Sequence, residues 1–395
     1  MVVFEIASHI RDRVPSTSIR AEDYVSTDNM YPNFGGIEPS SSSPPSGNVT
    51  AYQKGDILLS NIRPYFRKTW LATHSGGCNA DVLCIRANPE KCLPKYLYYL
   101  FTTDNFVMDY LKSCKGAKMP RGDVQRLLDY EFDLPDLPTQ LRIAGILGSF
   151  DEKIELNRKK IAELEALAKT IYDYWFVQFD FPDKNGKPYR SSGGKMVWNE
   201  QLKREIPAGW CNGKLSDIAY YASDKIQSNA IPLENYVTTD SMLQNKQGRD
   251  IATSLPPPGT SIVCFCESDT LVANIRPYLQ KIWFSNVKGG CSQDVLVFRA
   301  KKSCVPTFLY STLWQDNFFD YVMTGAKGSK MPRGDKDHIM SYPLALPVES
   351  LLSQYNKIVG DFWSRRNFAL LQITELTALR DLLLPLLMNG QVAVK

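Results

Sequence analysis

Residues 61–65 read Asn-Ile-Arg-Pro-Tyr, and residues 274–278 read Asn-Ile-Arg-Pro-Tyr again, 213 positions later. Working outward, further segments recur at an offset of 212 or 213: Tyr24-Val-Ser-Thr-Asp28 with Tyr236-Val-Thr-Thr-Asp240, Gly76-Gly-Cys78 with Gly289-Gly-Cys291, Asp81 with Asp294, and Gly116-Ala-Lys118-Met-Pro-Arg121-Gly-Asp123 with Gly328-Ser-Lys330-Met-Pro-Arg333-Gly-Asp335. Solenoid repeats have periods of roughly 20–50 residues. This much longer period indicates a duplicated domain. Two similar domains in one chain suit a two-fold symmetric partner, of which duplex DNA is the commonest.

Length and composition limit the class of protein. The 395 residues leave room for two or three domains, each with its own core. No apolar run approaches the roughly 20 residues of a membrane span, and the N-terminal segment lacks the pattern of a secretory signal. The nine cysteines are odd in number and scattered, which favours buried thiols in a reducing compartment over disulfides. We expect a cytoplasmic protein without a membrane segment.

The positive charge is concentrated in the repeats. The net charge of the chain is only +4. Residues 57–123 carry ten Lys/Arg against five Asp/Glu, and residues 270–335 carry nine against four, so each segment has a net charge of +5. Phosphate contacts would use such charge, although two solvated surfaces would show the same pattern.

Each repeat combines strands and a helical stretch. Short β-rich runs such as 57–62 and 294–298 are separated by Gly, Pro and Ser clusters, as expected for strands and loops. A helix is predicted from Pro94 to about Leu111, with a counterpart from Pro306 to about Met323, because Pro suits a first helical turn. The predicted fold class is therefore α/β (α+β), with a mostly antiparallel sheet in each domain.

A heptad pattern follows each repeat. Positions that step by four and three form one seam: Ile143, Leu147, Phe150, Ile154, Asn157, Ile161, Leu164, Ala168, Ile171 and Trp175. Only Asn157 is polar, and a buried amide at such a position can fix the register. Adding 212 gives a second seam: Tyr355, Val359, Phe362, Arg366, Ala369, Ile373, Leu376, Arg380, Leu383 and Leu387. This seam is apolar except at its two arginines.

The predicted order is a globular domain at 1–134, a long helix at 135–178, a linker at 179–208, a second domain at 209–346 and a second long helix at 347–390. The two apolar seams are expected to pack together. Because each helix follows its own domain, an antiparallel pair would place the domains at opposite ends around a pseudo-two-fold axis.

Signatures of catalysis are weak. Three scattered histidines do not form a metal triad, and the sequence lacks a phosphate-binding GxxxxGK[ST] loop and a dinucleotide fingerprint. Pro135-Asp136 followed by Asp151-Glu-Lys153 resembles a nuclease pattern. However, Asp151 and Lys153 fall inside the predicted helix, whereas that chemistry needs carboxylates converging on a metal. We expect no catalytic residue, no metal and no cofactor.

The candidate binding residues that recur in both repeats are basic and aromatic. The candidate DNA-binding residues in the shared motifs are Arg63, Tyr65, Lys118, Arg121, Arg276, Tyr278, Lys330 and Arg333. Pro after Arg63 and Arg276 fixes the backbone that presents the guanidinium and the ring, and cations in Gly/Pro loops suit phosphate. Two alternatives stay open: Arg63 and Arg276 pair with Asp81 and Asp294 inside the fold, or the Met-Pro-Arg-Gly-Asp runs are structural turns.

The segments that differ between the repeats are candidates for discriminating two base sequences. Shared loops would hold phosphate, and divergent loops such as 66–75 and 279–288 would read bases. The candidates in these loops are Arg67, Lys68, His74, Gln280, Lys281 and Lys288.

The duplicated domain, the paired heptad helices and the Asn-Ile-Arg-Pro-Tyr runs resemble the specificity subunit of a type I restriction-modification enzyme. Leu137-Pro-Thr-Gln140 and Leu346-Pro-Val-Glu349 stand where that family has a lead-in to each conserved helix. Ile206-Pro-Ala-Gly-Trp210 is similar to the opening of a target recognition domain. The first domain departs from the pattern, because it begins at Val3-Phe-Glu-Ile6 without this lead-in.

The resemblance implies a non-catalytic subunit whose two target recognition domains each read one half of a bipartite DNA site. The helices would set the spacer and dock two modification subunits, which bind S-adenosylmethionine and methylate adenine. Restriction subunits would join through the complex and supply translocation and cleavage. A coiled-coil scaffold joining two protein-binding domains is the alternative from another class, and a self-contained nuclease is a third.

Overall fold

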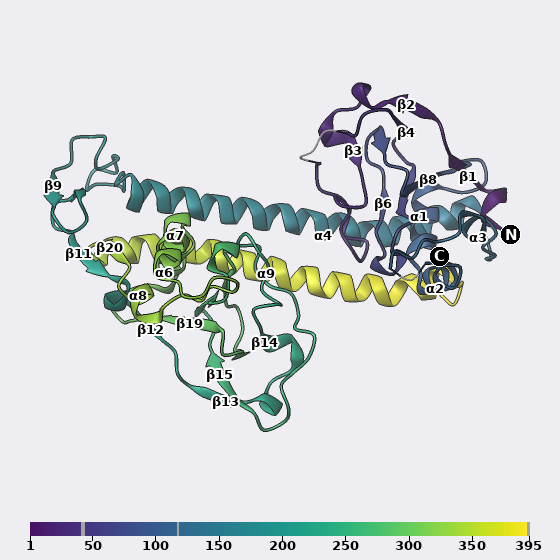
Figure 1. Ribbon diagram of the computed structural model, residues 1–395. Coiled ribbons are helices and arrows are strands. Elements are labelled where there is room, and N and C mark those ends of the chain that lie inside the picture. The colour runs from purple at the N-terminus through teal and green to yellow at the C-terminus, as the bar shows by residue number, and fades with distance from the viewer. Residues whose placement is uncertain (41–43, 117, 393–395) are drawn as a thin grey trace. The chain divides into compact units, whose positions relative to one another are not determined.

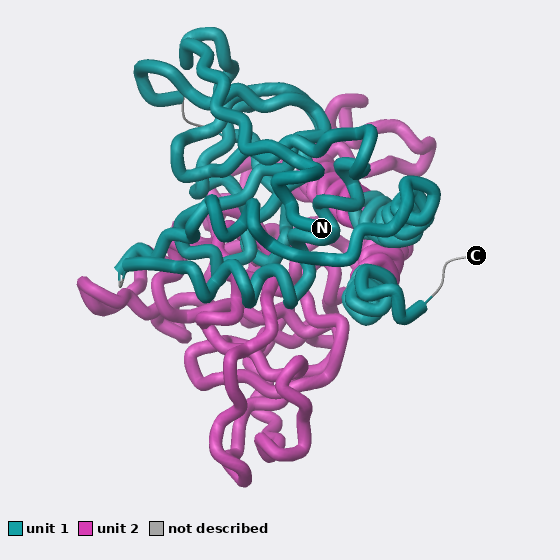
Figure 2. The backbone as a smooth tube through the Cα atoms, turned by 90° about the vertical axis from the view of Figure 1, so that its right-hand side faces the viewer, with its two compact units in different colours: residues 1–157, 372–395 teal, residues 158–371 magenta. Residues whose placement is uncertain are grey.

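The computed structural model describes residues 1–40, 44–116 and 118–392. It divides into two compact units, one formed by residues 1–157 with 372–395 and the other by residues 158–371 (Figure 2). Each unit holds one of the repeated sheet-containing regions and a stretch of both long helices. The domain boundaries given above, which assign each long helix as one piece, remain predictions.

Unit 1 contains two sheets, each of four short strands (Figure 1). One has the order β1-β8-β5-β6 and is antiparallel throughout; the other has the order β2-β4-β7-β3, with β3 parallel to β7. The strands are β1 (Ala7–Ile10), β2 (Arg13–Pro15), β3 (Tyr24–Val25), β4 (Asn48–Tyr52), β5 (Ile57–Ser60), β6 (Thr69–Leu71), β7 (Gly76–Cys78) and β8 (Val82–Ala87). The predicted strand at 57–62 is β5, which ends at Ser60 because the chain turns at the residues before Pro64.

Unit 2 repeats this arrangement. Its sheets have the orders β12-β19-β16-β17 and β13-β15-β18-β14, and again a single pair, β14 with β18, is parallel. The strands are β12 (Ala219–Tyr221), β13 (Lys225–Gln227), β14 (Tyr236–Val237), β15 (Ser261–Phe265), β16 (Thr270–Ala273), β17 (Ile282–Phe284), β18 (Gly289–Cys291) and β19 (Val295–Ala300). Two antiparallel pairs lie outside these sheets: the hairpin of β9 (Met196–Asn199) with β10 (Arg204–Pro207), and β11 (Cys211–Lys214) with the distant strand β20 (Pro343–Leu346). The α+β class is confirmed, and the stretch predicted as a linker contains the β9–β10 hairpin.

The helices differ from prediction in two respects: each stretch predicted as a single helix after the strands is two helices, and the short helices α3, α5 and α8 were not predicted. The helices are α1 (Pro94–Thr102), α2 (Asp104–Lys112), α3 (Val124–Leu128), α4 (Leu137–Tyr172), α5 (Leu215–Ile218), α6 (Pro306–Leu313), α7 (Asp316–Thr324), α8 (Lys336–Met340) and α9 (Glu349–Met388). Thr103 adopts an extended backbone, and its hydroxyl accepts a hydrogen bond from the N–H of Phe106. Thr103 is thus the N-cap of α2, and a residue with this role ends the preceding helix.

The helix pair in unit 1 is antiparallel. The start of α4 packs on the end of α9, because Ile143 and Leu147 share one core with Leu387 and the partly buried Leu383. Asn157 is only 3% exposed and donates to the side-chain carbonyl of Gln372 at 3.3 Å. The predicted buried amide is confirmed.

The helix pair in unit 2 is antiparallel as well. The aromatic end of α4, which continues into a π-helical turn at Asp173–Val177, packs on Tyr355 near the start of α9. Arg366, 7% exposed, pairs with Glu165 across the two helices. In unit 1 Arg380 pairs with Asp151. The arginines that interrupt the predicted seam thus have partners in the facing helix. In both pairs the residue numbers add up to 531, so the two units keep the same antiparallel register.

All ten predicted seam positions of the first helix are buried or half-buried. The apolar core of each unit joins the α1–α2 or α6–α7 region, one sheet and the helix pair. None of the described helices is long and apolar enough to span a membrane.

Candidate nucleic-acid interface

The Asn-Ile-Arg-Pro-Tyr loop has an unusual backbone in both domains. Arg63 has φ 49° and ψ 58°, and Arg276 has φ 51° and ψ 62°, both in the left-handed region. The following Pro starts a 3-10 turn, η4 (Pro64–Phe66) or η8 (Pro277–Leu279), which ends at a second left-handed residue. Non-glycine residues rarely adopt this conformation, and each costs of order 1–3 kcal/mol unless its surroundings enforce it. Both domains therefore carry this conformational cost at equivalent residues.

The Met-Pro-Arg-Gly-Asp loop supplies those surroundings. In unit 1 the N–H of Arg63 donates to the carbonyl of Pro120 at 2.8 Å, and the N–H of Gly122 donates to the carbonyl of Asn61 at 3.1 Å. Unit 2 repeats both bonds: Arg276 to Pro332 at 2.7 Å and Gly334 to Asn274 at 3.2 Å. Two motifs far apart in sequence are therefore joined by their backbones into one surface in each unit. We call this surface the loop pair; it comprises residues 61–67 with 115–123, and 274–280 with 327–335. Ala117 lies outside the described residues.

One arginine of each loop pair is held by a carboxylate. Arg121 Nη2 lies 2.8 Å from Asp81 Oδ1, and Arg333 Nη2 lies 3.2 Å from Asp294 Oδ2. The alternative weighed above gave these carboxylates to Arg63 and Arg276. Among the described residues that pairing is wrong, because Asp81 and Asp294 take the arginines of the other loop. Each pair is more than half exposed on the arginine side, so the guanidinium is oriented and still open to a ligand.

Most predicted residues of the shared motifs lie on the surface of the loop pairs. Tyr65 and Tyr278 are 48% and 52% exposed. Lys118, Arg121, Arg276, Lys330 and Arg333 are exposed as well. Arg63 is half-buried, and its Nε has no acceptor among the described residues. The structure thus brings cations and an aromatic ring together on each loop pair.

Three of the charged residues predicted to discriminate targets, Arg67, Lys68 and Lys281, have structural partners. Lys68 Nζ donates to the carbonyl of Thr27, and Lys281 Nζ donates to that of Thr239, both at 2.6 Å. The two lysines are equivalent in the repeats, so they form the same hydrogen bond in both domains. Arg67 pairs with Asp104 at 2.6 Å, whereas in unit 2 the equivalent Asp316 pairs with Lys246.

Asp316 has a lowered pKa, mainly because Lys246 hydrogen-bonds to it, and Gln280 contributes a further hydrogen bond. Lys246 comes from the loop before β15, which sequence reasoning left unassigned. One sequence signal could have pointed to Lys246. The second repeat has Gln280 where the first has Arg67, so Asp316 needs another cation as its partner. Lys288 is exposed.

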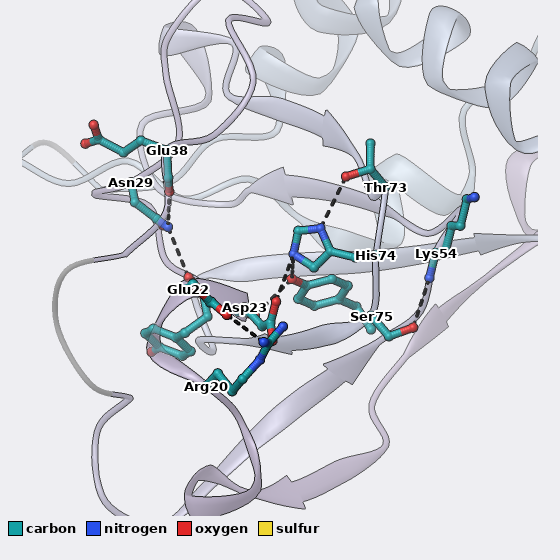
Figure 3. Close-up of polar contacts among 11 residues, drawn as sticks. Arg20, Glu22, Asp23, Asn29, Glu38, Lys54, Thr73, His74 and Ser75 are labelled. Atoms are coloured by element: carbon teal, nitrogen blue, oxygen red, sulfur yellow. Dashed lines mark hydrogen bonds and ion pairs between the residues drawn. The ribbon is translucent and has the colours of Figure 1, made fainter.

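His74 belongs to a polar network that only the first domain has (Figure 3). Its Nε2 lies 3.5 Å from Asp23 Oδ1 and 3.3 Å from the Tyr52 hydroxyl, while Nδ1 faces Thr73 Oγ1 at 3.2 Å. Burial raises the pKa of Tyr52. The equivalent residues of the second domain, at offsets of 212 or 213, are Phe265, Val287 and Asn235.

The resemblance to a nuclease pattern has no support in the geometry. Asp151 of α4 accepts hydrogen bonds from the Tyr99 hydroxyl of α1 at 2.5 Å and from Arg380 of α9 at 2.8 Å. Its carboxylate is therefore committed to protein partners. Within the described part of the chain, no cluster of three or more His, Cys, Asp and Glu side chains could hold a metal ion.

The chain is similar in sequence to known proteins over most of its length. Residues 13–166 match the family described as the type I restriction modification DNA specificity domain. The type I restriction enzyme MjaIX specificity subunit of Methanocaldococcus jannaschii is 25% identical over 374 residues, which cover 88% of this chain and 80% of that protein. The HindI specificity subunit of Haemophilus influenzae is 22% identical over 405 residues, with 87% of each chain covered.

A solved structure shares the fold. The type I restriction-modification S subunit from M. genitalium covers 100% of this chain and 96% of its own, with a TM-score of 0.59 and 14% sequence identity. Over most of its length, the chain is thus similar to specificity subunits of type I restriction-modification enzymes.

Proposed function

We propose that this chain gives a type I restriction-modification complex its DNA sequence specificity, with each repeated domain recognising one half of a bipartite site. The observation that carries the proposal is the loop pair, which is built twice with the same left-handed arginine, the same backbone hydrogen bonds and the same Arg–Asp contact. Each pair lies in a segment with a net charge of +5. A surface made identically in two domains serves a feature that both half-sites share, and the phosphate backbone is that feature.

Within this proposal, the residues of each domain divide into two tasks. Arg121, Lys118 and their counterparts Arg333 and Lys330 contact phosphates, and Tyr65 and Tyr278 add aromatic surface. Base discrimination falls to positions where the domains differ, such as Tyr52 and His74 of the polar network, whose equivalents in the second domain are the apolar Phe265 and Val287. Base edges in the major groove are told apart by donors and acceptors, so such a polar-to-apolar difference changes what can be read.

The long helices have the partner-docking and spacing roles in this proposal. Large apolar side chains remain exposed along them: Leu156 and Leu167 on α4, and Ile358, Phe368, Leu371, Leu379 and Leu382 on α9. Exposed apolar residues that recur along one element favour a protein partner. Two modification subunits would bind here, and restriction subunits would join through the complex. The chain itself would contribute recognition without catalysis, and its helices would fix the spacer between half-sites.

The test uses the purified chain alone and together with the modification subunit of the same restriction-modification system. Methylation of host DNA, read by sequencing the modified adenines, should require both proteins and should reveal one asymmetric bipartite motif. Methyl transfer or cleavage by the lone chain would contradict the proposed absence of catalysis. A reconstituted complex that methylates without sequence preference would contradict the recognition role.

A further inference from the structure

Unit 1 contains a cavity of about 340 Å³. It lies where the end of α1 and the start of α2 meet the paired stretches of α4 and α9. Tyr98 and Thr102 line it from α1, Asp151 from α4, and Arg380 and Leu384 from α9. The exposed residues Asp104 and Asn389 also line it, so it is open to solvent. A volume of this size is within the range of ligand pockets, roughly 300–1,000 Å³.

The equivalent place in unit 2 is filled by two indole rings. There the remaining space is only about 20 Å³. At the offset of 212, Trp314 stands for Thr102, Trp363 stands for Asp151, and Tyr310 stands for Tyr98. The Trp363 ring packs edge-on against Tyr310, with centroids 5.0 Å apart and an interplanar angle of 88°. The fold therefore has a site that holds indole, and in unit 1 the smaller Thr102 and Asp151 stand at the two tryptophan positions.

Cations flank the rings in unit 2, and cations are also present in unit 1. Lys246 Nζ lies 4.6 Å from the Trp314 ring, and the Arg366 guanidinium lies 5.1 Å from the Trp363 ring. In unit 1, Arg67 and Arg380 line the cavity. Guanidinium groups over an aromatic face add an attraction of about 0.5–1 kcal/mol at exposed sites. The lining thus suits a planar ring on Tyr98 and Leu384, with an arginine beside it.

The charges of the lining select the kind of molecule that carries the ring. Arg67 is already paired with Asp104, and Arg380 with Asp151. The carboxylate of Asp381, which is 58% exposed and lies 2.8 Å from Arg380 Nη2, also lines the cavity. Three carboxylates against two guanidinium groups leave the lining with a net negative charge. A phosphate-bearing ligand is therefore disfavoured, and an aromatic residue flanked by Lys or Arg is favoured.

We propose that the unit 1 cavity binds an aromatic side chain of indole size, carried by a basic segment of a partner polypeptide. Arg67 lines the cavity and is also the left-handed residue that ends η4 in the loop pair. An occupant would therefore contact a residue of the proposed DNA-binding surface. The site goes beyond the proposed recognition role and does not depend on it.

The test measures binding of two blocked dipeptides to the full-length chain by ligand-observed NMR: N-acetyl-Lys-Trp-amide and N-acetyl-Glu-Trp-amide. The basic peptide should bind about two- to five-fold more tightly, a difference of the size that one exposed charge contact gives. The difference should shrink in Asp381→Asn. Equal binding of the two peptides, or tighter binding of adenosine monophosphate than of the basic peptide, would overturn the proposed occupant.

The matched variants use the repeat itself. Thr102→Trp places in unit 1 the residue that fills the site in unit 2, and it should abolish peptide binding and raise the Tm. Thr170→Trp, at an exposed position of α4 in unit 2, adds the same side chain elsewhere and should leave binding unchanged. Trp314→Thr should open a second site and raise the stoichiometry from one to two. If this last variant does not fold, Thr102→Trp still decides: unchanged binding in that variant contradicts the cavity as the site.

Discussion

Arg380 of α9 donates a hydrogen bond from Nη1 to the Asp151 carboxylate of α4 at 2.8 Å. Both side chains are largely shielded, at 22% and 32% exposure. The same carboxylate accepts the hydroxyl proton of Tyr99 in α1. Burial raises the pKa of Tyr99, so the hydroxyl remains a donor at neutral pH. This one carboxylate therefore ties three helices of unit 1 together.

Replacing Arg380 by Met should destabilise unit 1 by about 2 kcal/mol, because a shielded carboxylate then loses a charged hydrogen-bond partner. The double variant Asp151→Asn with Arg380→Met should recover part of that loss, since the unpaired charge is removed. Urea unfolding of the two single variants and the double variant gives the coupling energy directly.

Arg365→Met is the matched control for Arg380→Met. Arg365 forms an i,i+4 pair with Asp361 on the same helix, but both side chains are at least half exposed. Exposed pairs of this kind contribute about 0.5 kcal/mol or less. Equal losses in the two variants would show that the Arg380–Asp151 contact contributes no more than a surface pair.

Removing a cation from the loop pair should weaken DNA binding to all sequences alike. For Lys118→Ala, Arg121→Ala, Lys330→Ala or Arg333→Ala, the slope of log K against log salt should fall by about 0.9 for each lost phosphate contact. The complex with the modification subunit is titrated with cognate and unrelated duplexes at several salt concentrations. Lys184→Ala removes an exposed lysine from a turn far along the sequence and should leave the slope unchanged. If the loop variants fold normally and keep the parent's slope of log K against log salt, these residues have a structural role and do not contact phosphate.

The acid stability of the second domain should depend on Asp335. Its pKa falls to about 2, mainly because Lys327 hydrogen-bonds to the carboxylate and backbone N–H groups at the start of α8 add to the effect. An unfolded Asp has a pKa of about 3.9. Because the folded pKa is depressed, the stabilisation is present above about pH 4 and is lost as the pH falls through about 2.

Asp335→Asn should therefore be less stable than the parent at pH 6, and the difference should shrink between about pH 4 and pH 2. Thermal unfolding followed by circular dichroism across this range measures it. Asp335→Ser, like Asp335→Asn, keeps a side-chain N-cap without a titrating group, so its loss of stability should shrink over the same pH range, because the titrating carboxylate is that of the parent. A difference between parent and Asp335→Asn that stays constant down to pH 2 would contradict the assignment.

The sequence predicts the framework better than the contacts. The sequence repeats predicted the duplicated α+β domain, and the heptads predicted the antiparallel helix pair. Both patterns depend on residue type at a fixed spacing. Residue spacing could not predict which charged side chains form ion pairs. Asp81 and Asp294 recur in both domains, but spacing does not say whether Arg63 or Arg121 faces them, since that depends on how two loops cross in space. The helix break at Thr103 was missed because apolar periodicity continues across it, and only the capping hydroxyl marks the new start.

The distance between half-sites should follow the length of the helix pair. The common register, in which paired residue numbers add up to 531, pairs position 160 with position 371. Insertions must therefore enter both helices together, after Lys159 and after Leu371. One heptad in each keeps the seam in phase, adds about 10 Å at 1.5 Å per residue, and corresponds to about three base pairs at 3.4 Å each.

A four-residue insertion in both helices is the matched comparison. It adds about 6 Å, close to two base pairs, but it breaks the heptad phase and should also lower stability. Both half-site sequences should stay the same in every variant, because the loop pairs and the divergent loops are untouched. Methylome sequencing of a host that carries each variant reads the spacer directly. An unchanged spacer in a variant that still assembles and methylates would mean that the helices do not set the distance.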